Sequence, residues 1–217
     1  NIEEAAESVV AAVEAAERMA GYSLTHAFVS VDGAQIASQN SRGVVAVSRP
    51  EEEIAGDDVR RVIEAARAVS LPSSREIVHA LPRYFSVDSQ SGVKDPVGMA
   101  GVRLEVETHL VTASATSIKN LSKCVAEVGA DIDGFVWAGL ASAEAVLSET
   151  EKELGVLLVD IGGGTTHIAI FVEGSLAYSS VLPIGAKNVT NELDIGLRVS
   201  LESAEKIKFP LGERRKK

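Results

Sequence analysis

The stretch that decides the fold of this chain reads Gly155-Val-Leu-Leu-Val-Asp160-Ile-Gly-Gly-Gly-Thr165-Thr-His167-Ile-Ala-Ile-Phe-Val172. It contains two short apolar runs, Val156 to Val159 and Ile168 to Val172, and each has the length of a strand. An acid, three glycines and two threonines stand between the runs. This order predicts a β-hairpin with a small, polar bend.

The bend of this hairpin has the composition of a phosphate-binding loop. Glycine lets backbone N–H groups approach a ligand because no Cβ stands in the way, and successive N–H groups form an anion-binding concavity. Two hydroxyls could add donors, and a carboxylate at the end of the first strand could meet a hydrated Mg²⁺. The alternative is a tight hairpin with a solvated acid. The candidate phosphate residues are Asp160, Gly162, Gly163, Gly164, Thr165 and Thr166, with Asp160 also the Mg²⁺ ligand through water.

The same segment resembles the second phosphate motif of the actin-like ATPases, a superfamily that includes actin, sugar kinases, heat-shock chaperone ATPases and bacterial filament proteins. Further motifs narrow the resemblance to the FtsA family of bacterial cell-division proteins, and it extends from the first helix to about Lys208. These motifs are Ser41-Arg-Gly-Val-Val45, Gly98-Met-Ala-Gly-Val-Arg-Leu-Glu105, Gly139-Leu-Ala-Ser-Ala-Glu144, Glu151-Lys-Glu-Leu-Gly155 and Val189-Thr-Asn191.

Strand and helix patterns alternate along the chain, which indicates an α/β protein. The resemblance implies a partial actin-like (ribonuclease H-like) ATPase fold with an inserted small α+β subdomain. It divides the chain into the end of a first actin-like domain (1–25), the inserted subdomain (26–112), the remainder of the first domain (113–147) and the start of a second domain with the phosphate hairpin (148–217). Both ends look cut, so we expect a segment of a longer protein.

Composition excludes several classes of function. The 217 residues carry a net charge of −10, and nucleic-acid binding favours clustered Lys and Arg instead. The single cysteine, Cys124, rules out an internal disulfide and fits a reducing cytoplasm. No apolar run reaches the length of a membrane span, and no signal-peptide pattern appears. The histidines lack ligand spacing, so we expect no transition metal held by protein ligands.

Three local patterns make predictions that the structure can test. Apolar residues recur at helical spacing between positions 5 and 19, with Gly21 as the C-terminal stop. Asp57 is expected to cap the helix that follows it. From 102 to 112, polar and apolar residues alternate, so we expect a strand with one face in water. The residues on that face are Arg103, Glu105, Glu107 and His109.

Two further candidate sites lie after the hairpin. Glu205 and Lys208 are three residues apart, which places both on one helix face. They could be an exposed ion pair, but the resemblance implies that this Glu–Lys pair flanks the adenosine of ATP. Gly185 lies at a strand-to-helix turn, where glycine is common, and the resemblance places it near the phosphates or a filament contact.

His167 departs from the family pattern, because most FtsA sequences have Asp or Asn there whereas actins have His. A neutral imidazole can accept a proton, so His167 is a candidate catalytic residue that orients the attacking water. The alternative is a histidine packed against neighbouring backbone. Histidine at this position could raise or lower the rate of ATP hydrolysis, and we expect the intact protein to be at most a weak ATPase.

The resemblance implies that the intact protein binds ATP and Mg²⁺ between two actin-like domains, polymerises, and links the tubulin-like protein FtsZ to the inner face of the cytoplasmic membrane at the division site. FtsZ would bind through a region outside these residues, and the membrane through a C-terminal amphipathic helix that is also outside them. Residues 26–112 would contact neighbouring subunits and other division proteins.

Two other functions compete with this interpretation. A pilus-assembly scaffold of the PilM type would share the inserted unit and bind a short peptide. A sugar kinase of the same superfamily would need a catalytic carboxylate and a sugar pocket. The first phosphate motif and the late adenosine motif are missing from these residues, so this segment alone is expected to bind ATP weakly or not at all.

Overall fold

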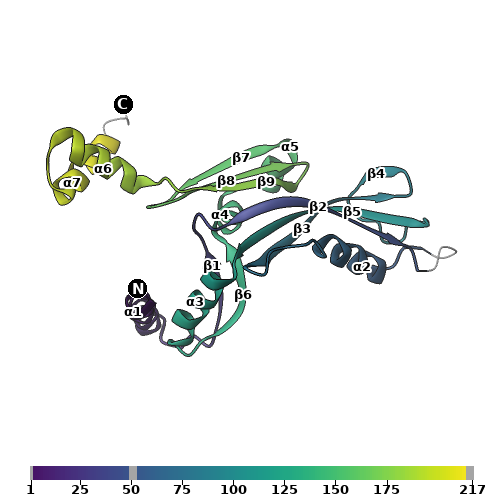
Figure 1. Cartoon of the computed structure of the whole chain (residues 1–217), viewed down its shortest axis with the longest axis horizontal. Helices are drawn as coiled ribbons and strands as arrows, with labels where there is room; N and C mark the ends of the chain where they lie inside the picture. The colour runs from purple at the N-terminus through teal and green to yellow at the C-terminus, as the bar shows by residue number, and fades with distance from the viewer. Residues whose placement is uncertain (1, 49–52, 214–217) are drawn as a thin grey trace.

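The computed structural model describes residues 2–48 and 53–213, and in this part the strands form three separate sheets (Figure 1). The predicted α/β class is confirmed, because helices and strands are interspersed along the described chain. The three sheets are a parallel pair, a four-stranded antiparallel sheet and a three-stranded antiparallel sheet.

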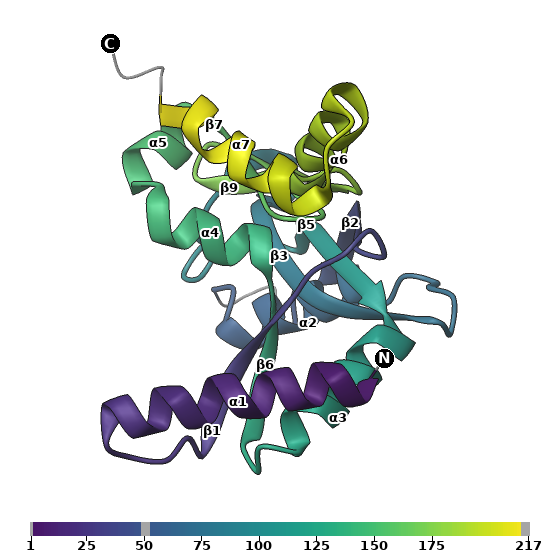
Figure 2. The same cartoon turned by 90° about the vertical axis from the view of Figure 1, so that its left-hand side faces the viewer.

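The parallel pair joins segments that are far apart in sequence. Strand β1 (His26–Val31) runs alongside β6 (Asp131–Trp137), and α3 (Ala115–Ala126) precedes β6. Helix α1 (Ile2–Ala20) lies beside α3 (Figure 2) and ends before Gly21, which has the positive φ of a helix stop, as predicted.

The four-stranded sheet has the order β2-β5-β3-β4 and carries one helix on a face. Gly43 lets α2 approach β2 closely, since a Cβ at this position would collide with the backbone of the helix. The elements are β2 (Ala37–Ala46), α2 (Gly56–Arg67), β3 (Arg75–Val87), β4 (Gln90–Val93) and β5 (Arg103–Ser114).

The three-stranded sheet contains the predicted hairpin and lies above the four-stranded sheet in Figure 1. Helices α6 and α7 follow it and pack against each other at one end of the molecule. The elements are α4 (Ala138–Val146), α5 (Glu149–Leu154), β7 (Val156–Ile161), β8 (Thr166–Val172), β9 (Ser175–Leu182), α6 (Ala186–Leu197) and α7 (Leu201–Glu213).

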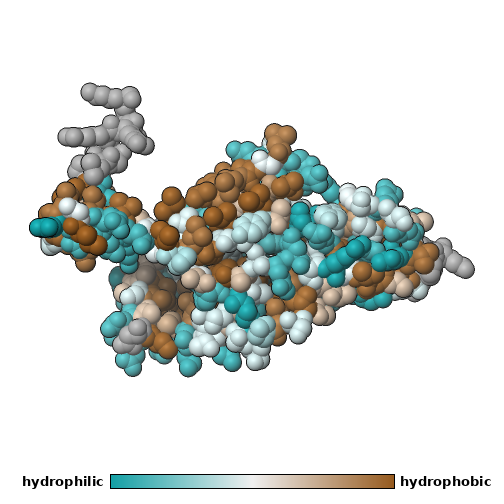
Figure 3. Space-filling model, turned by 45° about the horizontal axis from the view of Figure 1, so that its top comes forward, coloured by the Kyte–Doolittle hydropathy of each residue, from teal (hydrophilic) through white to brown (hydrophobic). Residues whose placement is uncertain are grey.

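Two hydrophobic clusters stabilise this arrangement. One lies inside the inserted unit, where α2 covers the sheet around Val62, Ala66 and Leu104. The other lies where the three sheets meet, around Trp137 and Phe171. The outer face of the three-stranded sheet is apolar but open, and it forms the brown area over β7–β9 in Figure 3. Its exposed side chains include Leu157, Val159, Ile161, Tyr178 and Leu182.

The structure corrects the predicted start of the inserted unit. Residues 26–31 form β1, which pairs with β6 instead of joining the four-stranded sheet. The sheet of the inserted unit begins with β2 at Ala37. A sequence pattern can indicate a strand, but it does not say which strand will pair with it.

The predicted wet face of β5 is also wrong for two of its four residues. Glu105 is only 4% exposed and His109 only 2% exposed. Arg42 and Arg103 pair with the Glu105 carboxylate, and β9 covers His109. The alternation is real, but both faces of this central strand are covered.

The predicted cap of α2 is wrong, because the N-cap residue is Ala55 and the acid that holds it is Asp58, the third residue of the helix. The helix begins after Ala55, and the carboxylate of Asp58, not Asp57, accepts the hydrogen bond from the Ala55 N–H. Among the described residues, no helix is both long and apolar enough to cross a membrane.

Candidate functional site

The predicted bend connects β7 and β8 and has a compact backbone. Asp160 and His167 are opposite each other in the strand pairing, and the next pair joins Ile161 to Thr166. The Gly162 N–H donates to the carbonyl of Thr165 at 2.8 Å, which closes the bend. The predicted hairpin is confirmed, and the structure adds its register.

Helix α6 holds the bend from one side. Its first N–H groups, from Ala186 and Lys187, donate to the carbonyls of Gly162 and Gly163, each at 2.8 Å. Gly185 makes this approach possible, because a Cβ there would lie 2.6 Å from the Gly162 oxygen. Gly185 thus lies against the glycine bend, whereas its predicted place near the phosphates or a filament contact stays a prediction.

The packing of the chain does not require glycine at the other two positions of the bend, Gly163 and Gly164. A Cβ at Gly164 would meet no atom within 4 Å, and one at Gly163 would make only ordinary contact with Lys187 at 3.8 Å. Neither has a positive φ, and neither N–H donates a backbone hydrogen bond in the part of the chain that the structure describes. Free N–H groups without side chains are what an incoming anion needs.

Asp160 is held in place by α4. One oxygen of its carboxylate, Oδ2, accepts a hydrogen bond from Ser142 Oγ at 2.7 Å, and the side chain is half-buried. The other oxygen keeps its lone pairs for a further ligand. Within the described residues no group of three His, Cys, Asp or Glu side chains converges, and the role of Asp160 as a Mg²⁺ ligand through water stays a prediction.

The bend also contacts a carboxylate that the sequence did not single out. Asp32 follows β1, and its Oδ2 accepts a hydrogen bond from Thr165 Oγ1 at 2.8 Å. Its Oδ1 lies 2.9 Å from Nε2 of His167 and also accepts from the Gly33 N–H. Partial burial raises the pKa of Asp32, but the hydrogen bonds from Thr165 and Gly33 and the nearby imidazole outweigh this and hold the pKa below its usual value.

His167 is enclosed in this conformation. Its side chain is only 3% exposed, and its ring lies 5.8 Å from that of Trp137. Nδ1 is buried and has no hydrogen-bond partner among the described residues. Only the Nε2 side faces the bend, where Asp32 occupies it, so the catalytic role of His167 stays a prediction that requires Asp32 to move.

Glu205 and Lys208 pair as their spacing predicted, at 2.7 Å, and both also contact Thr190 on α6. Thr190 Oγ1 donates to Glu205 at 2.5 Å and accepts from Lys208 Nζ at 2.9 Å. Lys208 and then Thr190 lower the pKa of Glu205 by hydrogen bonding. Helix α6 therefore contacts both groups: its first residues, Ala186 and Lys187, hold the glycine bend, and Thr190, about one turn later, contacts the Glu205–Lys208 pair. The adenosine role remains a prediction.

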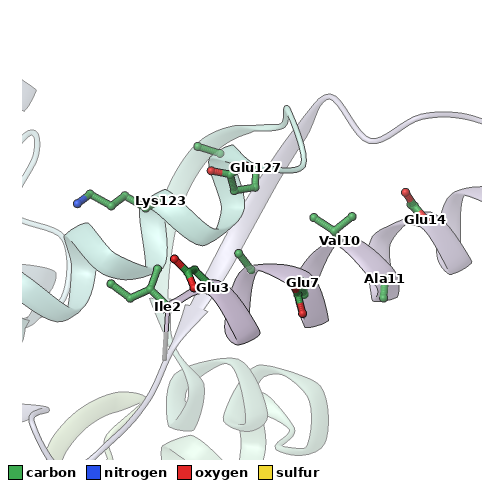
Figure 4. Close-up of a pocket in the computed structure, with 10 residues that line it drawn as sticks. Ile2, Glu3, Glu7, Val10, Ala11, Glu14, Lys123 and Glu127 are labelled. Carbon is green, nitrogen blue, oxygen red and sulfur yellow. The ribbon is translucent and has the colours of Figure 1, made fainter.

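A well-defined pocket lies apart from these residues. It lies between α1 and α3 and has a volume of about 660 Å³ (Figure 4). Four glutamates line it and only one lysine, Lys123. This charge does not suit a phosphate, so we do not place the nucleotide there.

The structure brings the predicted bend, Gly185 and the Glu205–Lys208 pair together along α6. Thr166 is engaged by the chain itself, because its hydroxyl donates to the Ile184 carbonyl at 2.7 Å. Sequence reasoning missed Asp32, Ser142 and Thr190. Ser142 and Thr190 stand inside two of the family motifs, and Asp32 ends a strand just before a glycine, which was the available signal.

Comparisons with known proteins agree with this geometry. Residues 33–112 match the family model described as the SHS2 domain inserted in FtsA, and residues 157–215 match the model of cell division protein FtsA. The cell division protein FtsA of Pseudomonas aeruginosa is 44% identical over 209 residues, which are 96% of this chain and 50% of that protein. The Bacillus subtilis FtsA is 47% identical over 212 residues, 98% of this chain and 48% of that protein.

The chain belongs to the FtsA family. It spans about half the length of the curated FtsA relatives it matches. Among solved structures, the PilM–PilN type IV pilus biogenesis complex is similar with a TM-score of 0.59 and 16% identity, over 87% of this chain and 52% of that one. At that identity the likeness concerns the fold alone. The fold of this FtsA-family chain is the actin-like ATPase fold with an inserted α+β subdomain.

Proposed function

We propose that the intact protein binds ATP with Mg²⁺, and that the β7–β8 bend contacts the phosphates. The single observation that carries this proposal is the pair Gly163 and Gly164. Their N–H groups have no backbone partner in the described part of the chain, and a Cβ at Gly164 would meet only open space. Packing does not explain these glycines, whereas a ligand that approaches the backbone would.

The residues around the bend fit such a ligand. Gly163, Gly164 and Thr165 would bind phosphate oxygens, and Asp160 would hold a hydrated Mg²⁺ through its second carboxylate oxygen, since Ser142 occupies the first. The cation would neutralise part of the phosphate charge. Glu205 and Lys208 would flank the adenosine from α7. His167 would orient the attacking water once its Nε2 is released, and we expect at most slow hydrolysis.

At the level of the whole protein, family membership supports a role in cell division. We infer that the intact protein polymerises and links FtsZ to the cytoplasmic face of the membrane at the division site. The FtsZ contact and the membrane contact would be made outside these residues, and the inserted unit would contact neighbouring subunits or other division proteins. Nucleotide would act chiefly by favouring one assembled state.

Calorimetric titration of Mg-ATP into the intact protein tests the proposed site. Asp160→Ala removes the proposed Mg²⁺ ligand, so we expect the affinity to fall by at least about tenfold. Asp131→Ala, which removes an exposed carboxylate at the far end of β6, is the matched control and should bind like the wild type. Equal binding by the Asp160→Ala protein, or no binding by the wild type, would point to a nucleotide-independent scaffold.

A further inference from the structure

Asp32 lies where the first sheet meets the phosphate bend. It follows β1, which pairs with β6, whereas its contacts Thr165 and His167 belong to the bend and to β8. The carboxylate is therefore a polar link between two parts of the fold that the backbone joins only through a long path. No family motif quoted above contains it.

The donors that Asp32 occupies are ones that a phosphate would use. Thr165 Oγ1 gives its hydrogen bond to Asp32 Oδ2 at 2.8 Å, and this hydroxyl is a predicted phosphate ligand. One hydroxyl has one proton to donate, so it cannot serve the carboxylate and a phosphate oxygen together. A carboxylate and a phosphate at neighbouring positions also repel each other strongly where water is partly excluded.

Asp32 can leave this position without disrupting the core. Its side chain is 45% exposed, and it precedes Gly33, which has a positive φ in a turn. His167 cannot leave, because it is 3% exposed and packs beside Trp137. A rotation of Asp32 into solvent would therefore free Thr165 Oγ1 and the Nε2 side of His167 at the same time.

We propose that Asp32 is a positioning residue that holds Thr165 and His167 in the absence of nucleotide and gives way to the terminal phosphate of a nucleoside triphosphate. This inference rests on the proposed function, since it assumes that the bend binds phosphate. It makes the carboxylate an internal competitor of the nucleotide. It also makes the release of His167 depend on the arrival of phosphate.

Asp32→Asn tests this idea in the intact protein, because it removes the charge and keeps an oxygen that can accept from Thr165. We expect Asp32→Asn to bind Mg-ATP about tenfold more tightly than the wild type, with a smaller gain for Mg-ADP and none for adenosine. Asp32→Ala should change affinity in the same direction. Asp131→Asn makes the same change in net charge at the opposite end of the β1–β6 pair and should leave all three affinities unchanged.

The outcomes separate this inference from the proposed function. If the wild type binds Mg-ATP, Asp160→Ala does not, and both Asp32 variants bind like the wild type, Asp32 is no competitor and only this inference fails. An equal gain for ATP, ADP and adenosine would also overturn it, since a general structural change would act on all three. If neither the wild type nor the Asp32 variants bind, the proposed function fails and this inference with it. Thermal unfolding of each variant checks that it is folded.

Discussion

At the scale of the residue, Gly185 and Gly164 lie close together in the structure, but glycine stands at each position for a different physical reason. Gly185 is crowded, since a Cβ there would lie 2.6 Å from the Gly162 carbonyl oxygen and 2.7 Å from Gly163. Gly164 is uncrowded and has no positive φ. The first glycine serves the packing of α6 on the bend, and the second has no role in the chain's own packing.

Paired alanine substitutions separate these two reasons. Gly185→Ala should lower the free energy of unfolding by about 1–3 kcal/mol, because a backbone contact must open. Gly164→Ala should leave it within about 0.5 kcal/mol of the wild type and still weaken Mg-ATP binding, since the new methyl would occupy ligand space. Urea unfolding and calorimetric titration of the intact protein measure the two effects. Normal ATP affinity in Gly164→Ala would contradict the proposed role of the bend.

At the scale of the element, the start of α2 depends on one buried carboxylate. Asp58 is 3% exposed and accepts hydrogen bonds from the Ala55 N–H, from Ser48 and from Arg61. The hydrogen bond from Arg61 is the largest cause of its pKa lying far below the usual value, against the opposing effect of burial. Asp57, which the sequence favoured, is exposed and pairs with Arg60.

These two neighbouring acids form a matched pair of variants. Asp58→Ala should lower the free energy of unfolding by about 2–4 kcal/mol, because it leaves several donors without their acceptor. Asp57→Ala should change it by less than about 0.5 kcal/mol, as is usual for an exposed ion pair. Chemical unfolding followed by circular dichroism measures both. Equal effects of the two substitutions would mean that Asp58 does not stabilise the start of α2.

At the scale of the whole molecule, the two antiparallel sheets meet through polar contacts. His109 on β5 bonds to Asn40 at 2.6 Å and to Ser179 on β9 at 2.8 Å. Ser38 and Ser175 add hydrogen bonds to backbone carbonyls across the same boundary. Burial first, and then the charge of Arg83, lower the pKa of His109 to about 4. The junction therefore depends on a neutral imidazole.

The stability of the chain should reflect this titration. Between pH 6.5 and about 4 the unfolded chain binds a proton at His109 that the folded chain excludes. Stability should therefore fall as the pH falls through this window, by up to about 1.4 kcal/mol per pH unit, and should not depend on His109 above it. His109→Gln should flatten the dependence, leaving a part from His79, whose pKa burial also lowers. An unchanged slope in His109→Gln would refute the assignment.

The sequence by itself determined the features that depend on local order. The hairpin of 156–172, its glycine bend and the pairing of Glu205 with Lys208 follow from short apolar runs, glycine content and helical spacing. The family motifs along the chain also determined the fold class. These features need only residues that are close in sequence, so a pattern can reveal them.

Only the tertiary structure decided which distant residues meet. In the structure, Asp32 contacts Thr165 and His167, and β1 pairs with β6. Glu105 and His109 are buried, although the pattern of their strand predicted one face in water. A strand's alternation records that its two faces differ, but not what covers each face. His109 is covered by β9, whose Ser179 lies seventy residues later along the chain, and no local pattern carries that information.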